Sequence, residues 1–364
     1  MHVIFQNHAL LIFASFVLAT IITFVAIPTV IDVARAKLLF DEPNGRGSHT
    51  QNTPTLGGLA IFTGYVIASM IFIDISRIPE IQYVIAGSII IFFIGLKDDI
   101  TGVDPLKKLI GQIIAAGIII DLGNIRIMSL EGFLGIYEID YFSSAVLSLF
   151  VVIVIINAFN LIDGIDGLAS GIGILTSSVF GFWFYLVGAY QLSILAASLV
   201  GALSTFFLFN VFGHKNKIFM GDTGSLLLGF FSSVLALKFI ALNSAMDNEF
   251  SMHTAPVIAI GILIVPLFDT LRVFTIRVLK KQSPFRADRQ HVHHRLLTLG
   301  NNHLQAASIL IGANVLFIGL VFFLRDIGIY WLALIVVMLA LILSYIPVML
   351  VRKKIKKNIP DPKA

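Results

Sequence analysis

Four amide and carboxylate side chains stand at intervals of three residues between two apolar stretches: Asn157, Asn160, Asp163 and Asp166. Each aspartate is followed by glycine. Steps of three advance an α-helix by about 300°, so one straight helix would place the first and last of these side chains on opposite faces. We therefore expect the helix to loosen at the glycines and the chain to wrap around a ligand such as a sugar or a base. Polar capping between two helices is the alternative interpretation.

A second motif, "FMGDTGS", places Asp222 just before another apolar stretch. Gly221 and Gly224 would allow the backbone to approach a ligand closely, and Thr223 or Ser225 could cap the following helix. A helix N-terminus attracts phosphate, whereas the carboxylate repels it. Both features are compatible if a divalent cation lies between them, and Mg²⁺ typically uses one or two carboxylates together with substrate phosphate oxygens. The alternative is that the aspartate is only an N-cap.

Two further carboxylate patterns occur near the ends of apolar stretches. Asp98 and Asp99 are adjacent in "KDDITGVDPLKK", and adjacent side chains on a helix point about 100° apart. We expect one to face the site and the other to support it, although charges at a helix end can simply be solvated. Asp269 and Arg272, at i and i+3 within an apolar stretch, are interpreted as a structural ion pair.

The motif "HVHHRLL" contains His291, His293, His294 and Arg295. Three histidines are compatible with zinc, but the chain has no cysteine and its loops offer mainly carboxylates and amides. Hard oxygen ligands favour Mg²⁺. We therefore expect these side chains to contact a pyrophosphate or a sugar, with a zinc site and a solvated basic loop as alternatives.

The elements that position these motifs are membrane helices. The chain is 57% hydrophobic and only 13% charged, with a mean hydropathy of +0.95, whereas soluble proteins carry about 25% charged residues. Only helices and closed barrels satisfy their backbone in lipid, and long, non-alternating apolar stretches argue against a barrel. No cleavable signal peptide is evident, and the net charge of +4 does not indicate a nucleic-acid partner.

We therefore predict an all-α polytopic membrane protein with about eleven transmembrane helices. Residues 1–351 should form a single integral membrane catalytic domain, followed by a basic cytoplasmic tail over 352–364. The alternating segment "GIYEIDYF" (135–142) predicts a small β-hairpin on the outer face. The expected spans are 9–31, 55–75, 82–97, 108–122, 144–159, 168–188, 191–211, 224–243, 255–277, 304–324 and 327–351.

Lysine and arginine predict the orientation. With the N-terminus outside and the C-terminus inside, the outer loops hold only Arg77, Arg126 and Arg325, and the remaining basic loop residues lie inside. All the motif loops then share the cytoplasmic face, which predicts one composite site there. A transporter is the alternative from a different functional class. Transporters place ionisable residues near the bilayer midplane and often contain repeats, so the one-sided clustering and the lack of a visible repeat favour an enzyme.

Five motifs together resemble the polyprenyl-phosphate N-acetylhexosamine-1-phosphate transferase superfamily, of the glycosyltransferase family 4 type. In chain order they are "RGSHTQNTPTLGG", "GLKDDITG", "NAFNLIDGIDGLASG", "FMGDTGSLLLG" and "HVHHRLL". The last resembles the undecaprenyl-phosphate GlcNAc-1-phosphate transferase branch. The peptidoglycan branch often carries lysine before its "GTPTMGG", where this chain has Asn52 before "TPTLGG".

The resemblance implies transfer of GlcNAc-1-phosphate from UDP-GlcNAc to undecaprenyl phosphate, with release of UMP, at the start of cell-surface polysaccharide synthesis. Another UDP-HexNAc or UDP-MurNAc-pentapeptide remains open as donor. The implied cofactor is Mg²⁺, for which Mn²⁺ can substitute, and the implied location is the bacterial cytoplasmic membrane; a homodimer remains open. The implied catalytic residues are Asp98, Asp99 and Asp222, with the metal at Asp222 and Asp98. The implied substrate-binding residues are His49, Asn157, Asn160, Asp163, Asp166, Phe219, Gly221, His291, His293, His294 and Arg295.

Overall fold

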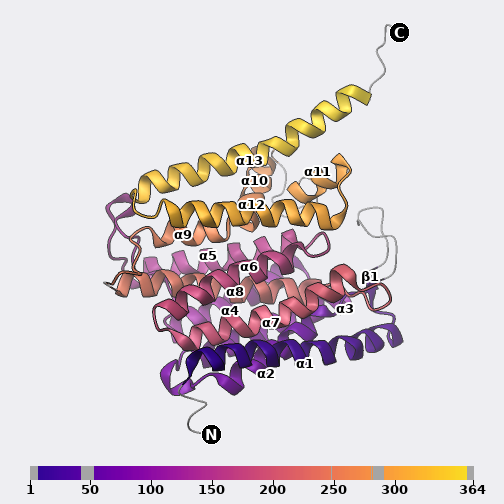
Figure 1. The fold of residues 1–364 in the computed structure, drawn as a ribbon, viewed down its shortest axis with the longest axis horizontal. Coiled ribbons are helices and arrows are strands. Elements are labelled where there is room, and N and C mark those ends of the chain that lie inside the picture. Colours follow the sequence, from indigo (N-terminus) through magenta and orange to yellow (C-terminus); the bar gives the residue numbers. More distant parts are fainter. Residues whose placement is uncertain (1–6, 42–52, 247, 280, 282–290, 359–364) are drawn as a thin grey trace.

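The computed structural model describes residues 7–41, 53–246, 248–279, 281 and 291–358, and it is a bundle of α-helices (Figure 1). The two short strands β1 (Phe40–Asp41) and β2 (Thr53–Pro54) pair antiparallel, with Phe40 opposite Pro54. The α-helices are α1 (His8–Ala36), α2 (Gly57–Phe72), α3 (Ile81–Thr101), α4 (Pro105–Gly117), α5 (Tyr141–Ile162), α6 (Leu168–Leu186), α7 (Tyr190–Phe212), α8 (Gly221–Ala245), α9 (Ala255–Ile262), α10 (Ile264–Leu279), α11 (Val292–Leu299), α12 (His303–Phe323) and α13 (Ile329–Asn358). Three short helical turns complete the described elements: 3-10 turns at Ile75–Arg77 and Phe133–Gly135 and a π-helical turn at Ile118–Leu122.

The helices identify a multi-pass membrane protein. Among the described residues, seven helices are long and apolar enough to cross a membrane, or eight if the bent pair α9 and α10 forms one span. The predicted number of about eleven is therefore not confirmed. Apolar composition alone does not set helix length: α2 has 16 residues, and α4 has 13 before the chain continues as a π-helical turn.

The span predicted at 255–277 is broken. Its halves α9 and α10 meet at an angle of 83°. Pro266 lacks a backbone N–H, so it cannot donate to the carbonyl of Ile262 one turn earlier. The buried side chain of Asn314 replaces that donor, because its Nδ2 lies 2.9 Å from the Ile262 carbonyl oxygen. Its Oδ1 also accepts from the Val265 N–H at 3.3 Å, so Asn314 bonds to both sides of the break.

The β-hairpin expected at 135–142 is not confirmed. The described residues there form no strand and follow a 3-10 turn at Phe133–Gly135. Glu131, Gly132, Leu134 and Gly135 all have positive φ, a conformation that curls the chain instead of extending it. Helix α13 runs past the expected start of the basic tail at residue 352 and ends at Asn358. Lysine and arginine are good helix formers, so the basic segment continues the last helix.

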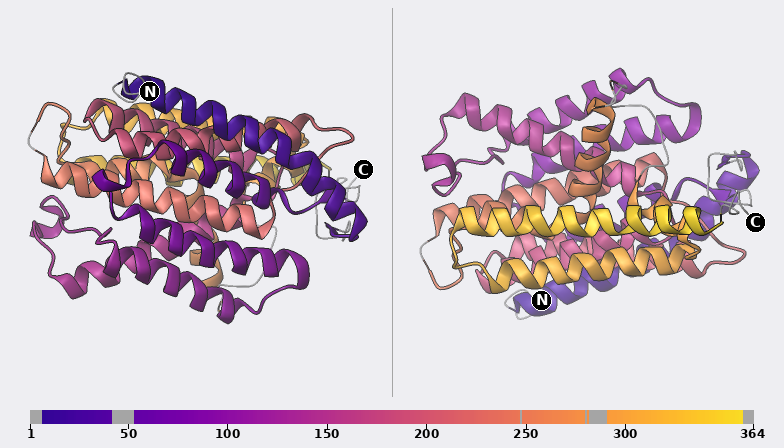
Figure 2. Two further views of the ribbon diagram at one scale, coloured as in Figure 1. Left: turned by 90° about the horizontal axis from the view of Figure 1, so that it is seen from below. Right: turned by 90° about the horizontal axis from the view of Figure 1, so that it is seen from above.

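Helix α8 lies at the centre of the bundle, packed against α2, α3, α5 and α6. In its 18-residue apolar stretch, 83% of the residues are buried. The helices from α1 to α8 run roughly along one axis and are joined by turns at the two ends of the bundle, whereas α10 crosses that axis (Figure 2). The C-terminal ends of α3, α5 and α7 therefore meet the N-terminal ends of α4, α6 and α8 at one end of the bundle, near β1 and α11 in Figure 1. We call this the site end.

Candidate active site

A pocket of about 540 Å³ opens at the site end. Five aspartates line it, together with amide, hydroxyl and aromatic side chains. Nine of the predicted site residues are among its walls, so most of the motifs do converge. Those nine are Asp98, Asp99, Asn160, Asp163, Asp166, Phe219, Gly221, Asp222 and His294; the other residues of the wall are Phe40, Thr55, Gly164, Ile165, Asn210, Met220 and Ser225.

Asp99 caps the N-terminus of α8 from the neighbouring helix α3. Its Oδ1 accepts from the Asp222 N–H at 2.6 Å, and its Oδ2 accepts from the Thr223 N–H at 3.0 Å and the Thr223 hydroxyl at 2.5 Å. The expectation that Thr223 or Ser225 caps this helix is therefore wrong. Both amides are already engaged, so in this arrangement they are not available to phosphate, and Asp222 is not a mere N-cap.

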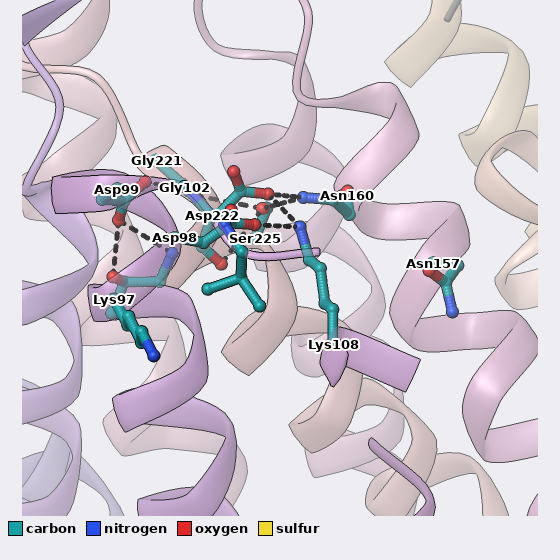
Figure 3. A network of polar contacts seen from close by, with 12 residues as sticks. Lys97, Asp98, Asp99, Gly102, Lys108, Asn157, Asn160, Gly221, Asp222 and Ser225 are labelled. Atoms are coloured by element: carbon teal, nitrogen blue, oxygen red, sulfur yellow. Dashed lines mark hydrogen bonds and ion pairs between the residues drawn. The ribbon is translucent and has the colours of Figure 1, made fainter. Parts of the chain in front are cut away.

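Lys108 joins the two carboxylates that the sequence suggested as metal ligands (Figure 3). Its Nζ lies 2.6 Å from Asp98 Oδ2 and 2.6 Å from Asp222 Oδ1. Asn160 Nδ2 donates to the same Asp222 oxygen at 2.5 Å, and the Val103 N–H holds the other Asp98 oxygen at 2.7 Å. Sequence reasoning missed Lys108, although it lies in the quoted "DPLKK" segment.

The glycine of "MGD" serves the chain's own packing. Gly221 has a φ of +71°, and a Cβ there would collide with the Thr55 carbonyl and lie 2.7 Å from both Asp99 carboxylate oxygens. The "TPTLGG" segment binds the same loop through its backbone: Phe219 N–H donates to Pro54 at 2.8 Å, and Gly57 N–H donates to Phe219 at 2.9 Å. The left-handed backbone conformation of Gly221 therefore allows Asp99 and the segment around β2 to pack closely against the start of α8.

The turn between α5 and α6 confirms the predicted loosening, because α5 ends at Ile162 and α6 begins at Leu168. Burial, and then the carboxylates of Asp222, Asp99 and Asp166, raise the pKa of Asp163 to about 8. Burial is the larger cause and the neighbouring carboxylates add to it, so Asp163 lies in a buried part of the pocket that also carries negative charge.

Asp166 fastens this turn to two other elements. Its Oδ2 lies 2.7 Å from Lys217 Nζ and 2.9 Å from His303 Nδ1. Burial alone would raise the pKa of Asp166, but the hydrogen bonds and charges of His303 and Lys217 outweigh burial and hold the pKa below its ordinary value. Asn210 adds a further contact by accepting from the Gly167 N–H at 2.7 Å. Lys217, His303 and Asn210 were not predicted, because each lies far along the chain from the turn that it contacts.

Asn157 does not line the pocket. Its Nδ2 donates to Gln112 Oε1 and to the Ile153 carbonyl oxygen, both at 2.8 Å, and it lies apart from the network around Asp222 (Figure 3). One turn of helix separates it from Asn160, and the rotation between them takes the two amides to different neighbours. In this structure Asn157 links α5 to α4.

The histidine motif divides between the pocket and the protein interior. His294 lines the pocket, whereas His291 and His293 are buried. His291 Nδ1 lies 3.0 Å from Asp269 Oδ2, and the predicted Asp269–Arg272 ion pair is confirmed at 3.1 Å. Burial, and then the nearby charge of His294, lower the pKa of His293 to about 3.

The remaining predicted residues have other positions. His293 also borders a second, largely apolar pocket of about 340 Å³ among α10, α11, α12 and α13. Arg295 follows His294 on α11 but is not part of the first pocket's wall. His49 lies outside the described residues. Within the described part of the chain, no three His, Asp or Glu side chains form a ready metal site.

Asp98 and Asp222 nevertheless fit a magnesium ion. The Lys108 ammonium already places one positive charge against both carboxylates. Mg²⁺ in phosphate-handling sites characteristically uses one or two carboxylates and completes its shell with water and phosphate oxygens. Two aspartates with the Asn160 amide nearby match that requirement better than a zinc site, which needs three or four protein ligands.

Comparisons with known proteins identify the family of the chain. Residues 81–240 match the family model described as glycosyl transferase family 4. The chain is 33% identical over 341 residues to a probable undecaprenyl-phosphate N-acetylglucosaminyl 1-phosphate transferase of Bacillus subtilis, covering 92% of this chain and 90% of that protein.

Two other relatives carry related names. A decaprenyl-phosphate N-acetylglucosaminephosphotransferase of Mycolicibacterium smegmatis is 33% identical over 72% of this chain and 70% of its own length. An undecaprenyl-phosphate alpha-N-acetylglucosaminyl 1-phosphate transferase of Escherichia coli O157:H7 is 31% identical over 75% of this chain and 73% of its own. The chain therefore belongs to glycosyl transferase family 4, in its branch of polyprenyl-phosphate N-acetylglucosamine-1-phosphate transferases.

Proposed function

We propose that the protein transfers GlcNAc-1-phosphate from UDP-GlcNAc to undecaprenyl phosphate and releases UMP, in the first step of a cell-surface polysaccharide. The observation that carries the proposal is the pair Asp98 and Asp222, which share one cationic group inside a pocket at the end of a membrane bundle. A diphosphate donor can bind among these carboxylates when cations offset their charge, and a lipid acceptor needs the surrounding apolar helices. The names of the relatives support the donor and the acceptor class.

In this proposal, Asp222 and Asp98 would hold Mg²⁺, which would supply positive charge to offset the diphosphate and the leaving group. An oxygen of the lipid phosphate forms a bond to the β-phosphorus of the donor. The bond from that phosphorus to the bridging oxygen breaks, and UMP departs with the electron pair. Lys108, whose Nζ lies between Asp98 and Asp222, would add a second positive charge beside the diphosphate.

The structure suggests separate roles for the two adjacent aspartates. Both oxygens of Asp99 accept hydrogen bonds from α8, so we assign Asp99 to the positioning of Asp222. Among the described residues, Asp98 accepts from Lys108 and the Val103 N–H only. We therefore assign Asp98 to the metal or to the last proton of the lipid phosphate.

The donor nucleotide would occupy the side of the pocket formed by Phe219 and the Asp163–Asp166 turn. Lys217 Nζ lies 5.5 Å from the centre of the Phe219 ring and holds Asp166. The Phe219 ring, stabilised by this lysine contact, suits stacking against a uracil ring. His294 lines the same pocket and would contact the sugar or its phosphates.

We further propose that the site end faces the cytoplasm of a bacterium, with the N-terminus outside. The excess of lysine and arginine in the loops at this end supports that orientation.

The test is a transfer assay on purified protein in detergent with undecaprenyl phosphate and Mg²⁺. UDP-GlcNAc, UDP-GalNAc and UDP-MurNAc-pentapeptide are offered in parallel. We expect lipid-linked GlcNAc-phosphate from the wild type, loss of turnover in Asp222→Asn, and no loss in the matched control Asp326→Asn, whose carboxylate is 88% exposed at the other end of the bundle. Turnover of a different donor alone would refute the donor assignment. UMP release without any lipid acceptor would refute direct attack by the lipid phosphate.

A further inference from the structure

Helix α11 (Val292–Leu299) carries His294 to the pocket but has only eight residues. A helix this short is not stable by itself in water. Its position must therefore come from contacts with other elements. Val292, His293 and Leu296 are buried against neighbouring elements, and charged side chains bind both ends of the helix.

The N-terminal end of α11 is held by Asp269, a buried residue of α10. Asp269 Oδ1 accepts from the Val292 N–H at 3.1 Å. Its Oδ2 lies 3.0 Å from Nδ1 of His291, the residue that precedes the helix. The carboxylate thus satisfies a free amide at the helix N-terminus, as an N-cap side chain would, but it comes from another helix.

The C-terminal end is held by Lys354, from the basic end of α13. The last four carbonyl groups of a helix lack partners within it. In α11, Asn301 Nδ2 donates to Leu296 at 3.0 Å and the Gly300 N–H donates to Leu297 at 2.9 Å. Lys354 Nζ donates to the remaining two, Thr298 and Leu299, at 3.0 Å each. All four carbonyl oxygens are therefore satisfied.

The signs of these charges match the helix dipole, which favours an anion at the N-terminus and a cation at the C-terminus. We propose that Asp269 and Lys354 are positioning residues that jointly set the place of α11, and with it the presentation of His294 to the donor. The role in donor binding rests on the proposed function, whereas the placement of α11 does not. The end of α13 is then part of the active-site scaffold in addition to being a basic membrane flank.

Lys353 offers a matched control. It is the preceding residue, carries the same charge and is exposed, and unlike Lys354 it donates no hydrogen bond to α11 among the described residues. Lys353→Met and Lys354→Met therefore remove the same charge from the same membrane flank. Only the second removes the contact with α11, and because Lys354 is exposed at the surface this variant should fold.

The first readout is hydrogen exchange of the α11 amides in the full-length protein. We expect Lys354→Met to speed exchange roughly twofold to fivefold, the range that a charge at a helix end supplies. Lys353→Met should leave exchange unchanged, and Lys354→Arg should restore it. Equal exchange in the two methionine variants would overturn the proposal.

The second readout is steady-state kinetics with UDP-GlcNAc. We expect Lys354→Met to raise the donor KM by a similar factor with little change in kcat, while the Mg²⁺ concentration for half-maximal activity stays the same, because the metal carboxylates lie on α3 and α8. An unchanged donor KM despite faster exchange would refute the link to the donor. If no donor is turned over by the wild type, the proposed function fails, and the exchange result still decides the placement of α11.

Discussion

Replacing Asp99 by asparagine should destabilise the protein, whereas the same replacement at Asp98 should remove activity with much less destabilisation. The two residues are adjacent and the chemical change is identical. Asp99 accepts three hydrogen bonds from the first turn of α8, and α8 is the central helix of the bundle. Asp98 accepts one backbone bond and the Lys108 ammonium, and Lys108 keeps Asp222 as a partner when Asp98 is neutralised.

The magnitude follows from these contacts. An asparagine at position 99 keeps one acceptor oxygen but turns an NH₂ group toward a backbone N–H. Loss of an N-cap costs about 1 kcal/mol, and loss of a hydrogen bond to a charged group costs about 1.5–3 kcal/mol. We expect a total of about 2–4 kcal/mol for Asp99→Asn and about 1 kcal/mol for Asp98→Asn, which loses one charged contact and keeps one acceptor oxygen.

The assay is the apparent midpoint of thermal unfolding in detergent at a fixed scan rate, since large membrane proteins often unfold irreversibly. At about 2 °C per kcal/mol for a chain of this size, Asp99→Asn should lower the midpoint by roughly 5 °C. Transfer activity is measured on the same samples below that midpoint. A normal midpoint with abolished turnover in Asp99→Asn would refute the positioning role and make Asp99 a reacting group. An equal fall in both midpoints would show that Asp98 also supports the fold.

Three further outcomes follow from the structure. Lys108→Met should increase the stabilisation by added MgCl₂, because an ammonium that competes for Asp98 and Asp222 is gone; an unchanged or smaller shift of the unfolding midpoint would contradict that competition. Gly221→Ala should cost about 1–3 kcal/mol through its left-handed backbone and the collision with Thr55, whereas Gly312→Ala, on α12 with open space around it, should be neutral or stabilising in the same thermal assay. The chain has no cysteine, so Asn216→Cys and Glu138→Cys each provide a single thiol, at opposite ends of the bundle. A maleimide reagent that cannot cross the membrane should label only Glu138→Cys in intact cells. Labelling of Asn216→Cys alone would show that the proposed orientation is inverted.

The parts of the site that sequence predicted are those carried by dense local motifs. Asp98 and Asp222 stand beside glycines or other aspartates, and both line the pocket. The three-residue spacing of 157–166 predicted a break in the helix, and α5 ends there. Spacing does not predict the rotation of the helix, however. Asn157 therefore contacts α4 whereas Asn160 reaches Asp222.

The parts that sequence missed depend on contacts between distant segments. Lys108 resembles any basic residue at a helix start until the fold brings Asp222, 114 residues away, to its ammonium group. The break between α9 and α10 was read as one span because both halves are apolar. Its stabilisation depends on Asn314, a polar side chain 52 residues later. Hydropathy measures the preference of a segment for lipid and carries no information about such partners.

The hydrogen bonds between Asp99 and the start of α8 have a consequence for the insertion of the protein into the membrane during synthesis. The carboxylate and the amides that it caps are separated by more than 120 residues. During synthesis, α3 therefore enters the bilayer long before α8 exists, and its terminal aspartates must remain hydrated at the membrane surface until the later helix is inserted. The pocket is thus assembled late, and a nascent chain that stops before α8 can be stable in lipid and still contain no active site.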